Sequence, residues 1–364
     1  MRLTTMEGTR LLRTLRLTNF LSYGPNAEEI ELEPLNVLIG PNGSGKSNFI
    51  HAISLLQAAP SDIGAPIRGG GGMPEWPWKG GGASPPVDLQ VETTVSYPQG
   101  PMPLRYSFQL VRVAQGLELL KEAVENERPT ESDGEAPCCF YSYDRGSAVL
   151  KVRENEDAPV GMCAGRSERH LGRRDLHPSK SILAQRTDPD RYPELGYLAD
   201  EFSKVRLFRI CQLGPRSALL GPLGADQPSG FPMEDGRNLG MVLNDLLNQL
   251  PVKRRILDEL RRFYPYVEEI SQRFVANTVE TFFQEGYFAT PSARLSDGTL
   301  RYLFLLTILC HPAPPRLVCI EDPEVALHPD ALPRLAELLV EASERTQLVV
   351  TTHSDVLVSA LSHM

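Results

Sequence analysis

Short apolar runs alternate with helical patterns at both ends of the chain. Residues 35–39 form an apolar run that predicts a buried strand, and apolar residues at helical spacing follow from Ser47 onward. The C-terminal part repeats this alternation, with predicted helices at 300–309 and 333–345 and predicted strands at 316–320 and 348–351. Strands that alternate with helices predict a parallel α/β sheet, assembled here from segments far apart in the sequence.

The middle of the chain carries a two-residue period instead. Alternating apolar residues predict an antiparallel meander at 87–97, 104–113 and 117–124. We also predict a strand at 205–210, helices at 239–250 and across 251–270, and a hairpin at 274–289. The glycine-rich stretch 67–86, which contains both tryptophans, predicts a loop, whereas residues 125–195 give no clear pattern.

Composition sets the broad class of protein. Hydrophobic residues make up 41% and charged residues 23% of the 364 residues, as in ordinary globular proteins. No apolar run approaches the roughly 20 residues that span a bilayer, so we expect a cytoplasmic protein without membrane contact. The six cysteines show no paired CxxC spacing and no nearby histidines, so we expect reduced thiols and no zinc site. A net charge of −9 argues against a surface that binds nucleic acid throughout, but leaves a local basic groove open.

A phosphate-binding loop is the most specific motif. Residues 40–47 match the pattern G-x-x-x-x-G-K-[ST] at every fixed position, between a predicted strand and a predicted helix. The glycines allow backbone N–H groups to point at a β-phosphate, Lys46 adds a charge, and the Ser47 hydroxyl suits a bound Mg²⁺. A chance glycine-rich turn would not require both flanking elements. We therefore predict that ATP and Mg²⁺ bind at Gly40, Pro41, Asn42, Gly43, Ser44, Gly45, Lys46, Ser47 and Asn48.

Two acids follow the predicted strand 316–320. A carboxylate at the end of a strand beside a phosphate loop typically holds Mg²⁺, and the next acid polarises the attacking water. By position, Glu321 takes the metal role and Asp322 the catalytic role. Paired acids also occur as plain turn or capping residues, but here the buried strand and the phosphate loop occur together, which favours the functional interpretation.

Three further motifs occur in a fixed order. LSDGT at 295–299 precedes an apolar helix, VALH at 325–328 follows the paired acids, and TTHSD at 351–355 follows the last predicted strand. They resemble the signature motif, D-loop and switch histidine of ABC-type ATPases. Together with NFLSYG near the start and IGPNGSGKSN, they resemble the RecF-like and SMC-like ATPases, including the ATPase half of OLD-family nucleases. The matching segments span about 20–56 and 291–358.

The resemblance implies an architecture. It is an α/β fold, a P-loop ABC-type ATPase head with a mixed central sheet, an antiparallel β-meander subdomain and an inserted, mainly helical lobe. Residues 1–165 would form the N-terminal half of the head with a variable insert, 166–290 the lobe, and 291–364 the C-terminal half. The 249-residue separation of Lys46 from Leu295 disfavours a transporter subunit, and the lack of sustained heptads disfavours a long coiled coil.

The resemblance also implies roles in a dimer. The signature residues Ser296, Asp297 and Gly298 would act in trans, on the γ-phosphate bound to a second subunit, and His353 would sense that phosphate. From the residues alone, Ser296 or Asp297 caps the following helix and Gly298 allows close approach of an anion. A histidine after a strand is ordinarily structural, so only the resemblance makes His353 a catalytic candidate.

The sequence departs from the ABC pattern in two places. The acids run Glu-Asp where Asp-Glu is common, which shortens the catalytic side chain by one methylene and predicts slow hydrolysis. His328 replaces the D-loop aspartate, which weakens the implied crosstalk between subunits. The Q-loop glutamine has no clear position, and Gln90 and Gln185 are the candidates.

Contacts with DNA are less well defined. A basic stripe on the predicted helix after residue 250 comprises Lys253, Arg254, Arg255, Arg261 and Arg262. The alternative is an ordinary solvated face, with the i,i+4 pairs Asp258 to Arg262 and Arg255 to Glu259. Trp76 and Trp78 offer stacking surfaces for bases or a partner, or belong to a surface loop.

These observations support one principal function and one alternative. The principal reading is an ATPase whose ATP-driven homodimerisation acts in DNA repair or another transaction on double-stranded DNA, with a nuclease or repair partner. The alternative is a non-hydrolysing, ATP-dependent regulatory module, of the kind used in antiphage defence, whose output belongs to a partner protein. Only eleven residues follow His353, too few for a Toprim nuclease domain, and we expect a truncated or partial chain.

Overall fold

Two compact units make up the chain. The computed structural model describes residues 9–80, 86–113, 116–129, 136–154, 158–172, 174–209 and 223–364. One of the two units, which we call the antiparallel unit, comprises Arg10–Glu33 and the described part of Asn42–Val205. The second, the parallel unit, comprises Thr9, Pro34–Pro41 and the described part of Arg206–Met364.

A four-stranded parallel sheet forms the centre of the parallel unit. Its strand order is β10-β15-β16-β3. The strands span Arg206–Arg209 (β10), Leu317–Glu321 (β15), Gln347–Thr352 (β16) and Leu35–Ile39 (β3). All residues of β15 and β16 are buried, as expected for strands covered on both faces. The predicted parallel sheet, assembled from distant segments, is thus confirmed, as is the mixed α/β fold class.

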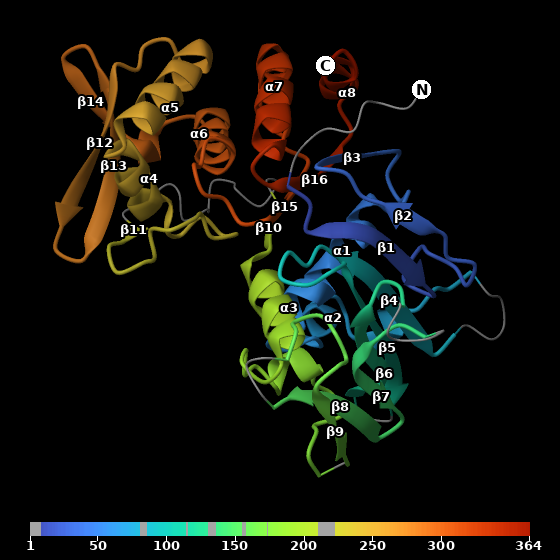
Figure 1. Cartoon of the computed structure of the whole chain (residues 1–364). Helices are drawn as coiled ribbons and strands as arrows, with labels where there is room; N and C mark the ends of the chain where they lie inside the picture. Colours follow the sequence, from blue (N-terminus) through green and yellow to red (C-terminus); the bar gives the residue numbers. More distant parts are fainter. Residues whose placement is uncertain are drawn as a thin grey trace. The chain divides into compact units, whose positions relative to one another are not determined.

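Three helices of the C-terminal segment belong to the same unit as this sheet. They span Asp297–Leu309 (α6), Leu332–Ser343 (α7) and Asp355–Ser362 (α8). The α6 helix is buried from Thr299 to Leu309 and belongs to the same apolar cluster as β15, β16 and α7. In Figure 1, α6 (orange) and α7 (red) lie near β15 and β16. The 3₁₀ turn η6, Pro329–Ala331, leads into α7.

A lobe of two helices and a small antiparallel sheet belongs to the same unit. It contains β11 (Leu223–Gly224), α4 (Leu239–Leu247), α5 (Leu250–Phe263), β12 (Glu269–Val275), β13 (Thr278–Glu285) and β14 (Phe288–Pro291). In Figure 1 the strands β12, β13 and β14 lie beside α4 and α5. The helix predicted across 251–270 ends at Phe263, because Pro265 disfavours helical backbone at Tyr264, and residues 269–275 form a strand instead.

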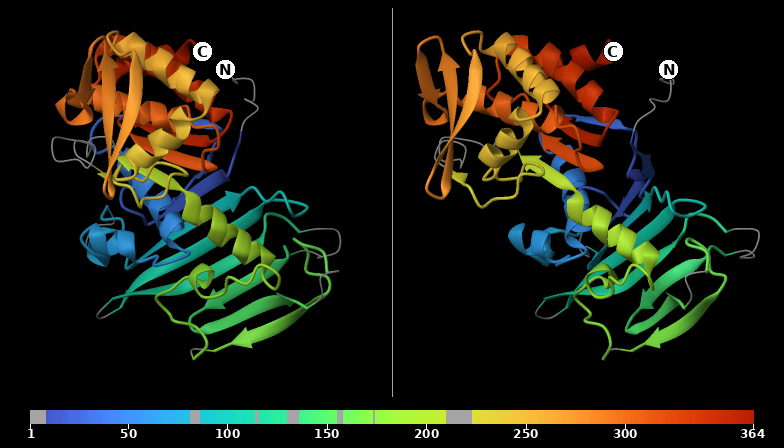
Figure 2. Two further views of the ribbon diagram at one scale, coloured as in Figure 1. Left: turned by 90° about the vertical axis from the view of Figure 1, so that its left-hand side faces the viewer. Right: turned by 60° about the vertical axis from the view of Figure 1, so that its left-hand side comes forward.

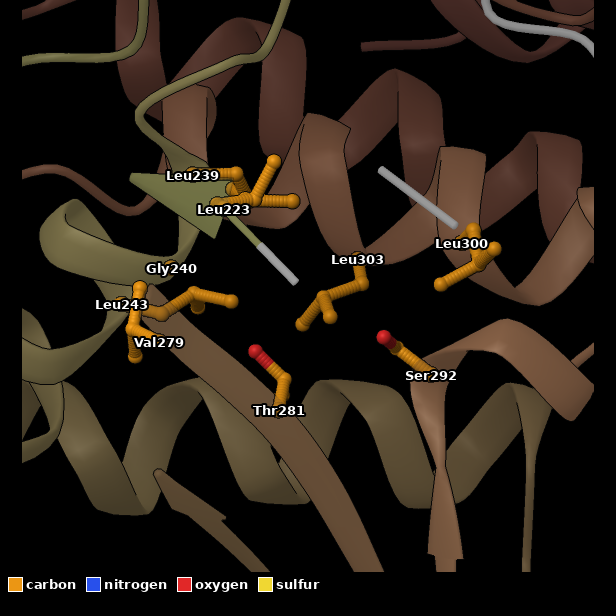
Figure 3. Close-up of a pocket in the computed structure, with 9 residues that line it drawn as sticks. All are labelled: Leu223, Leu239, Gly240, Leu243, Val279, Thr281, Ser292, Leu300 and Leu303. Atoms are coloured by element: carbon orange, nitrogen blue, oxygen red, sulfur yellow. The ribbon is translucent and has the colours of Figure 1, made fainter. Parts of the chain in front are cut away.

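The lobe packs closely around one small cavity. Figure 3 shows its lining, in which Thr281 and Ser292 contribute hydroxyl groups among apolar side chains of α4, α6 and β13. About 10 Å³ is available there to the centre of a water molecule. A cavity of this size holds about one water molecule, so it is a packing defect and not a ligand site.

An eight-stranded sheet dominates the antiparallel unit, in the order β2-β1-β4-β5-β6-β7-β8-β9. The strands span Leu12–Thr18 (β1), Glu29–Glu31 (β2), Asp88–Val95 (β4), Leu104–Val113 (β5), Gly116–Asn126 (β6), Cys139–Asp144 (β7), Ser147–Arg153 (β8) and Arg166–Leu171 (β9). The predicted meander is confirmed as β4, β5 and β6. It continues through three strands in the region that gave no clear pattern.

Helices cover the apolar face of this sheet. They are α1 (Lys46–Ala58) and α3 (Pro193–Lys204), which pack against each other, with the shorter α2 (Ala65–Gly69), η1 (Met73–Glu75) and η2 (Ile182–Ala184) nearby. Both views of Figure 2 show α3 lying along the sheet. The opposite face is polar, and Arg105 bridges Glu92 and Glu125 across three strands. The strict alternation in β5 produces these two faces.

The described part of the glycine-rich stretch, mainly residues 67–80, forms more regular structure than the predicted loop. It contains α2 and η1, and Trp76 is only 3% exposed. The Trp76 ring stacks on His51 of α1 at 5.5 Å and meets Phe20 edge-on at 5.6 Å. Trp76 therefore belongs to the core, and the idea that it stacks on bases or a partner is wrong. Trp78 is half-buried, and its backbone N–H donates to Asn19.

Two cysteines are paired. Cys138, immediately before β7, forms a disulfide with Cys163, in the turn before β9. The expectation of reduced thiols is therefore wrong for this pair, because the hairpin that brings the two residues together could not be read from the sequence. Cys139, Cys310 and Cys319 are free thiols, and Cys211 lies outside the described residues.

A buried ion pair joins the same region to α3. Arg166 of β9 and Glu194 in the first turn of α3 have side chains that are 0% exposed, and their two hydrogen bonds measure 2.6 and 2.8 Å. Glu194 also accepts the backbone N–H of Gly161 at 2.7 Å. Since a buried charge without its partner is strongly unfavourable, this pair fastens β9 and its turn to α3.

Removing one partner of this pair tests its importance. Glu194→Ala leaves the Arg166 guanidinium buried without a counter-charge, so we expect the free energy of unfolding to fall by about 3–5 kcal/mol in chemical denaturation. Asp200→Ala is the control, because Asp200 lies on the same helix in an exposed pair with Lys204 and should matter by less than about 1 kcal/mol. Equal losses in the two variants would contradict the prediction.

A second buried acid anchors the segment before α3. Glu122 of β6 accepts hydrogen bonds from Tyr106 at 2.8 Å, from the Ser181 hydroxyl at 2.6 Å and from the Ile182 backbone at 2.9 Å. Burial raises the pKa of Glu122 from 4.5 to about 7, although these hydrogen bonds lower it. The group therefore titrates near neutral pH in the folded protein.

This titration predicts a pH-dependent stability. Because the folded pKa exceeds the unfolded one, the stabilising contribution of neutral Glu122 is complete below pH 4.5 and is lost as the pH rises through about 7. The loss amounts to about 1.4 kcal/mol per pH unit between these limits. Glu122→Gln cannot ionise, so its stability relative to wild type should increase between about pH 5 and 8, measured by denaturation. Parallel curves for the two proteins would contradict this, and Glu118→Gln on the same strand is the control.

Candidate functional site

The phosphate loop connects β3 to α1. Gly43 and Gly45 have left-handed backbones, with φ of 80° and 98°. Such backbone points successive N–H groups toward one side and forms an anion-binding nest. Lys46 and Ser47 open the first turn of α1, whose N-terminus carries partial positive charge. The predicted strand, loop and helix are therefore all present.

A turn after β1 packs directly on this loop. Leu21 has a left-handed backbone with φ of 49°, and the Ser22 hydroxyl accepts the Asn48 side-chain N–H at 2.9 Å. The Tyr23 hydroxyl donates to the Gly45 carbonyl at 3.4 Å, and burial raises the pKa of Tyr23. Ser22 and Tyr23 lie within the NFLSYG motif, but the sequence gave no role for either residue. The structure shows that they support the phosphate loop.

This contact explains why residue 45 is a glycine. A Cβ at Gly45 would lie 2.5 Å from the Ser22 hydroxyl, whereas, apart from the adjacent residues, no atom of the described residues lies within 4 Å of a Cβ at Gly43. Alanine at either position adopts an unfavourable left-handed backbone, which costs about 1–2 kcal/mol. Only Gly45→Ala adds a collision, so we expect it to lower the Tm more than Gly43→Ala. Ser22→Gly should recover part of this loss in the double variant; no recovery would contradict the explanation.

The carboxyl ends of three parallel strands meet at one edge of the sheet in the parallel unit. Glu321 of β15 pairs in register with Thr351 of β16, and Thr352 pairs with Ile39 of β3. The paired acids, the switch histidine and the start of the phosphate loop at Gly40 therefore follow neighbouring strands. The structure brings together these predicted residues of the parallel unit.

Glu321 occupies a mostly buried position at this edge. Glu321 is 8% exposed. Its Oε2 lies 3.4 Å from Nε of Arg209 at the end of β10, whereas its buried Oε1 has no hydrogen-bond partner among the described residues. Burial raises the pKa of Glu321, the Arg209 charge opposes this, and Asp322 adds to it. Arg209 was not predicted, because only the parallel pairing of β10 with β15 places it beside Glu321.

This environment fits a magnesium ligand. Mg²⁺ prefers hard oxygen donors and usually binds one or two protein carboxylates together with phosphates and water. The partnerless Oε1 of Glu321 is such a donor. Within the described part of the chain, no cluster of three or more His, Cys, Asp or Glu side chains could hold a metal ion by itself. The donor set therefore fits a Mg²⁺ that arrives with a nucleotide.

Asp322 is held in an unusual backbone conformation. Its φ is 49°, a strained value for a non-glycine residue of the kind that concentrates at functional sites. Its backbone N–H donates to the Thr351 carbonyl at 3.1 Å and to the Thr351 hydroxyl at 3.2 Å. That hydroxyl donates to Asp322 Oδ1 at 3.3 Å, and Nε2 of His353 lies 4.0 Å from the same oxygen. The predicted catalytic acid and switch histidine therefore face each other.

The signature motif begins α6 as a capped helix. The Ser296 hydroxyl accepts the Thr299 backbone N–H at 3.1 Å, and Asp297 lies in the first turn. This confirms the local capping role that the residues alone suggest. A Cβ at Gly298 would lie 2.7 Å from the Ala326 carbonyl oxygen, so the glycine allows α6 to approach the loop after the paired acids. The trans role of this motif remains a prediction.

The remaining candidates have local roles in the structure. His328 caps η6 by accepting the Asp330 backbone N–H at 3.3 Å. Gln90 lies within β4, and Gln185 bonds to the backbone around His177, so both belong to the antiparallel unit.

The basic stripe on α5 is largely occupied by ion pairs. Lys253 pairs with Glu269, Arg255 with Glu341, Arg261 with Asp258 and Arg262 with Glu259. The predicted i,i+4 pairs of Asp258 with Arg262 and of Arg255 with Glu259 are wrong. Arg262 instead pairs with Glu259 at i,i+3 spacing, and Arg255 pairs with Glu341 of α7. The stripe is nevertheless mainly a paired, solvated face.

Fold and site together define a class of protein. A phosphate loop between β3 and α1, two acids at the end of β15 and a histidine after β16 are the arrangement of an ABC-type P-loop ATPase head. Residues 35–135 and 197–359, more than half of the chain, match the family described as "AAA domain, putative AbiEii toxin, Type IV TA system". The chain belongs to this family of P-loop ATPases.

Solved structures show the same fold. An SMC head bound to the C-winged helix domain of ScpA is similar, with a TM-score of 0.51 and 15% identity, covering 96% of this chain and 92% of that chain. The SMC head domain from Thermotoga maritima has a TM-score of 0.46 at 15% identity, with the same coverages. A Pyrococcus furiosus Smc head bound to the C-terminal domain of ScpA has a TM-score of 0.46 at 14% identity, covering 96% and 91%. At 15% identity, the first of these similarities establishes an SMC-head-like fold and nothing beyond the fold.

No curated protein sequence matches the chain. None of the helices in the described ranges is both long and apolar enough to span a bilayer.

Proposed function

We propose that this protein binds and hydrolyses ATP with Mg²⁺. The observation that carries the proposal is the Asp322–His353 pair beside Glu321, on the strands next to the one that enters the phosphate loop. Membership of a P-loop ATPase family supports it independently. A buried carboxylate with one partnerless oxygen, Oε1 of Glu321, and a strained acid beside a histidine have clear uses in hydrolysis and no evident use in stability.

Each residue has a defined task in this proposal. The loop amides and Lys46 bind the triphosphate, and Ser47 and Glu321 hold Mg²⁺, which supplies neutralisation of phosphate charge when bound. Asp322 accepts a proton as water attacks the γ-phosphorus and the bond to the β–γ bridging oxygen breaks. His353 orients the water and the γ-phosphate. Asp322 is one methylene shorter than the glutamate common at this position, so we expect slow turnover.

The finer function extends the proposal to a dimer on DNA. Ser296, Asp297 and Gly298 of a second copy contact the γ-phosphate, so that ATP closes a homodimer and hydrolysis opens it. The dimer acts on double-stranded DNA with a repair or nuclease partner. The order of motifs and the SMC-head fold support this reading. The ion-paired arginines of α5 give it little support, so DNA would bind elsewhere.

The family description favours a second candidate function. The description of the family, not of this chain, names a toxin of a type IV toxin–antitoxin system. Applied to this chain, it supports the alternative of a regulatory module in defence, in which ATP binding without turnover controls a partner protein. The two candidate functions differ in whether the protein hydrolyses ATP with Asp322 as the general base.

Steady-state ATPase measurements with and without DNA separate them. We expect Lys46→Ala to abolish ATP binding, because the loop loses its only formal charge. Asp322→Asn should retain ATP binding but lower kcat by about 100-fold or more, as for loss of a general base. Arg254→Ala, on the exposed side of α5, is the control and should change neither quantity. Slow turnover that Asp322→Asn leaves unaffected, or none at all, would favour the regulatory module.

A further inference from the structure

Glu324, two residues after Asp322, is bonded to the segment that carries the switch histidine. Its Oε1 accepts hydrogen bonds from the Thr352 hydroxyl at 2.6 Å and from the His353 backbone N–H at 2.8 Å. The same Thr352 hydroxyl accepts the backbone N–H of Ser354 at 3.0 Å. One carboxylate therefore fixes three consecutive residues where β16 ends.

Stability alone does not explain this arrangement. Hydrogen bonds that a carboxylate accepts are charge-assisted and roughly twice as strong as neutral ones. The second oxygen of Glu324, Oε2, is nevertheless buried without a hydrogen-bond partner among the described residues. A buried polar atom without a partner costs about 1–3 kcal/mol. An uncharged acceptor could bond His353 without leaving a carboxylate oxygen buried, so the acid at this position calls for a role beyond packing.

The loop that follows Glu324 is in contact with the signature helix. The loop after β15 turns back through a hydrogen bond of 3.1 Å from the Val325 N–H to the Asp322 carbonyl. The Val325 carbonyl accepts an N–H of Arg301, a residue of α6 that is 7% exposed, at 3.3 Å. The next carbonyl, of Ala326, is the one that Gly298 approaches. The loop thus contacts α6 on one side and the His353 segment on the other.

Small displacements matter for the histidine. Its Nε2 lies 4.0 Å from Asp322 Oδ1, beyond hydrogen-bond length, and its side chain is 41% exposed. Among the described residues the ring makes no other polar contact that fixes its distance from Asp322, so the backbone position of His353 sets this distance. A misplacement of about 1 Å in a catalytic group can lower a rate by about 100-fold.

We propose that Glu324 is a positioning residue that fixes His353 against Asp322 and ties this pair to the signature helix. The inference rests on the proposed ATP hydrolysis for its catalytic consequence, but not for the placement of His353. Glu324 itself makes no contact with nucleotide in this proposal. Its effect on hydrolysis passes entirely through His353.

Two physical measurements test the placement without nucleotide. Hydrogen–deuterium exchange should show faster exchange of the His353 and Ser354 amides in Glu324→Ala than in wild type. The imidazole NMR signal of His353, assigned with His353→Ala, should shift in the same variant. Glu324→Gln keeps one acceptor oxygen and should give intermediate effects. Glu344→Gln, an exposed acid of the same unit, is the control and should change neither measurement.

Kinetics test the consequence for hydrolysis. We expect Glu324→Ala to lower kcat by about 10–100-fold while the ATP affinity changes less than about twofold. In a His353→Ala background, the same substitution should lower kcat by less than about threefold, because its effect passes through the missing ring. A merely structural role would change the Tm and lower both kcat and ATP affinity. The milder Glu324→Gln keeps the test valid if Glu324→Ala folds poorly.

The outcomes separate this inference from the proposed function. If wild type does not hydrolyse ATP, the proposed function fails, and the exchange and NMR results alone decide the placement. If wild type hydrolyses ATP and Glu324→Ala leaves kcat unchanged, or acts additively with His353→Ala, the inference is overturned while the proposed function stands. An unchanged His353 signal together with unchanged amide exchange overturns the inference in either case.

Discussion

The parallel pairing of β15 with β16, and of β16 with β3, is the constraint on which the candidate site depends. Backbone hydrogen bonds in register set Glu321 beside Thr351 and Thr352 beside Ile39. Strands that run in the same direction end at the same edge, so residues nearly the whole chain apart become neighbours. Thr351 then joins the two strand ends through its side chain, which bonds both the backbone and the carboxylate of Asp322. The strand pairing alone therefore places the candidate catalytic residues at one edge of the sheet.

The phosphate loop depends on a different contact, within the antiparallel unit. Its left-handed glycines provide the backbone conformation, and the Ser22–Tyr23 turn fills the space that a side chain at residue 45 would need. Asn48 bonds that turn from the first helical turn of α1. The loop shape is thus determined by β1 as well as by its own sequence. The motif is therefore easy to recognise in the sequence, but its conformation also depends on the turn that follows β1.

Sequence patterns predicted the parts that local physics determines. The continuous apolar runs of β15 and β16 and the glycine motif were clear, because burial on both faces and left-handed backbone leave strong signals. The strand β9, RSERHL, was missed, since it lies at the sheet edge and is mostly exposed. The burial of Trp76 and the bonds of Arg209 and Glu324 were also missed. Each depends on a partner from a distant segment, which single-sequence periodicity does not report.

The disulfide and the Arg166–Glu194 pair both lie in a segment that the family match leaves out, residues 136–196. This segment contributes β7, β8 and β9 and lengthens the eight-stranded sheet only at its far end, beyond β6. Growth at a free edge leaves the registers of all earlier strands unchanged. The pairing of β1, β4 and β5 therefore does not depend on the added strands, and the disulfide and the Arg166–Glu194 pair hold the added segment in its own shape.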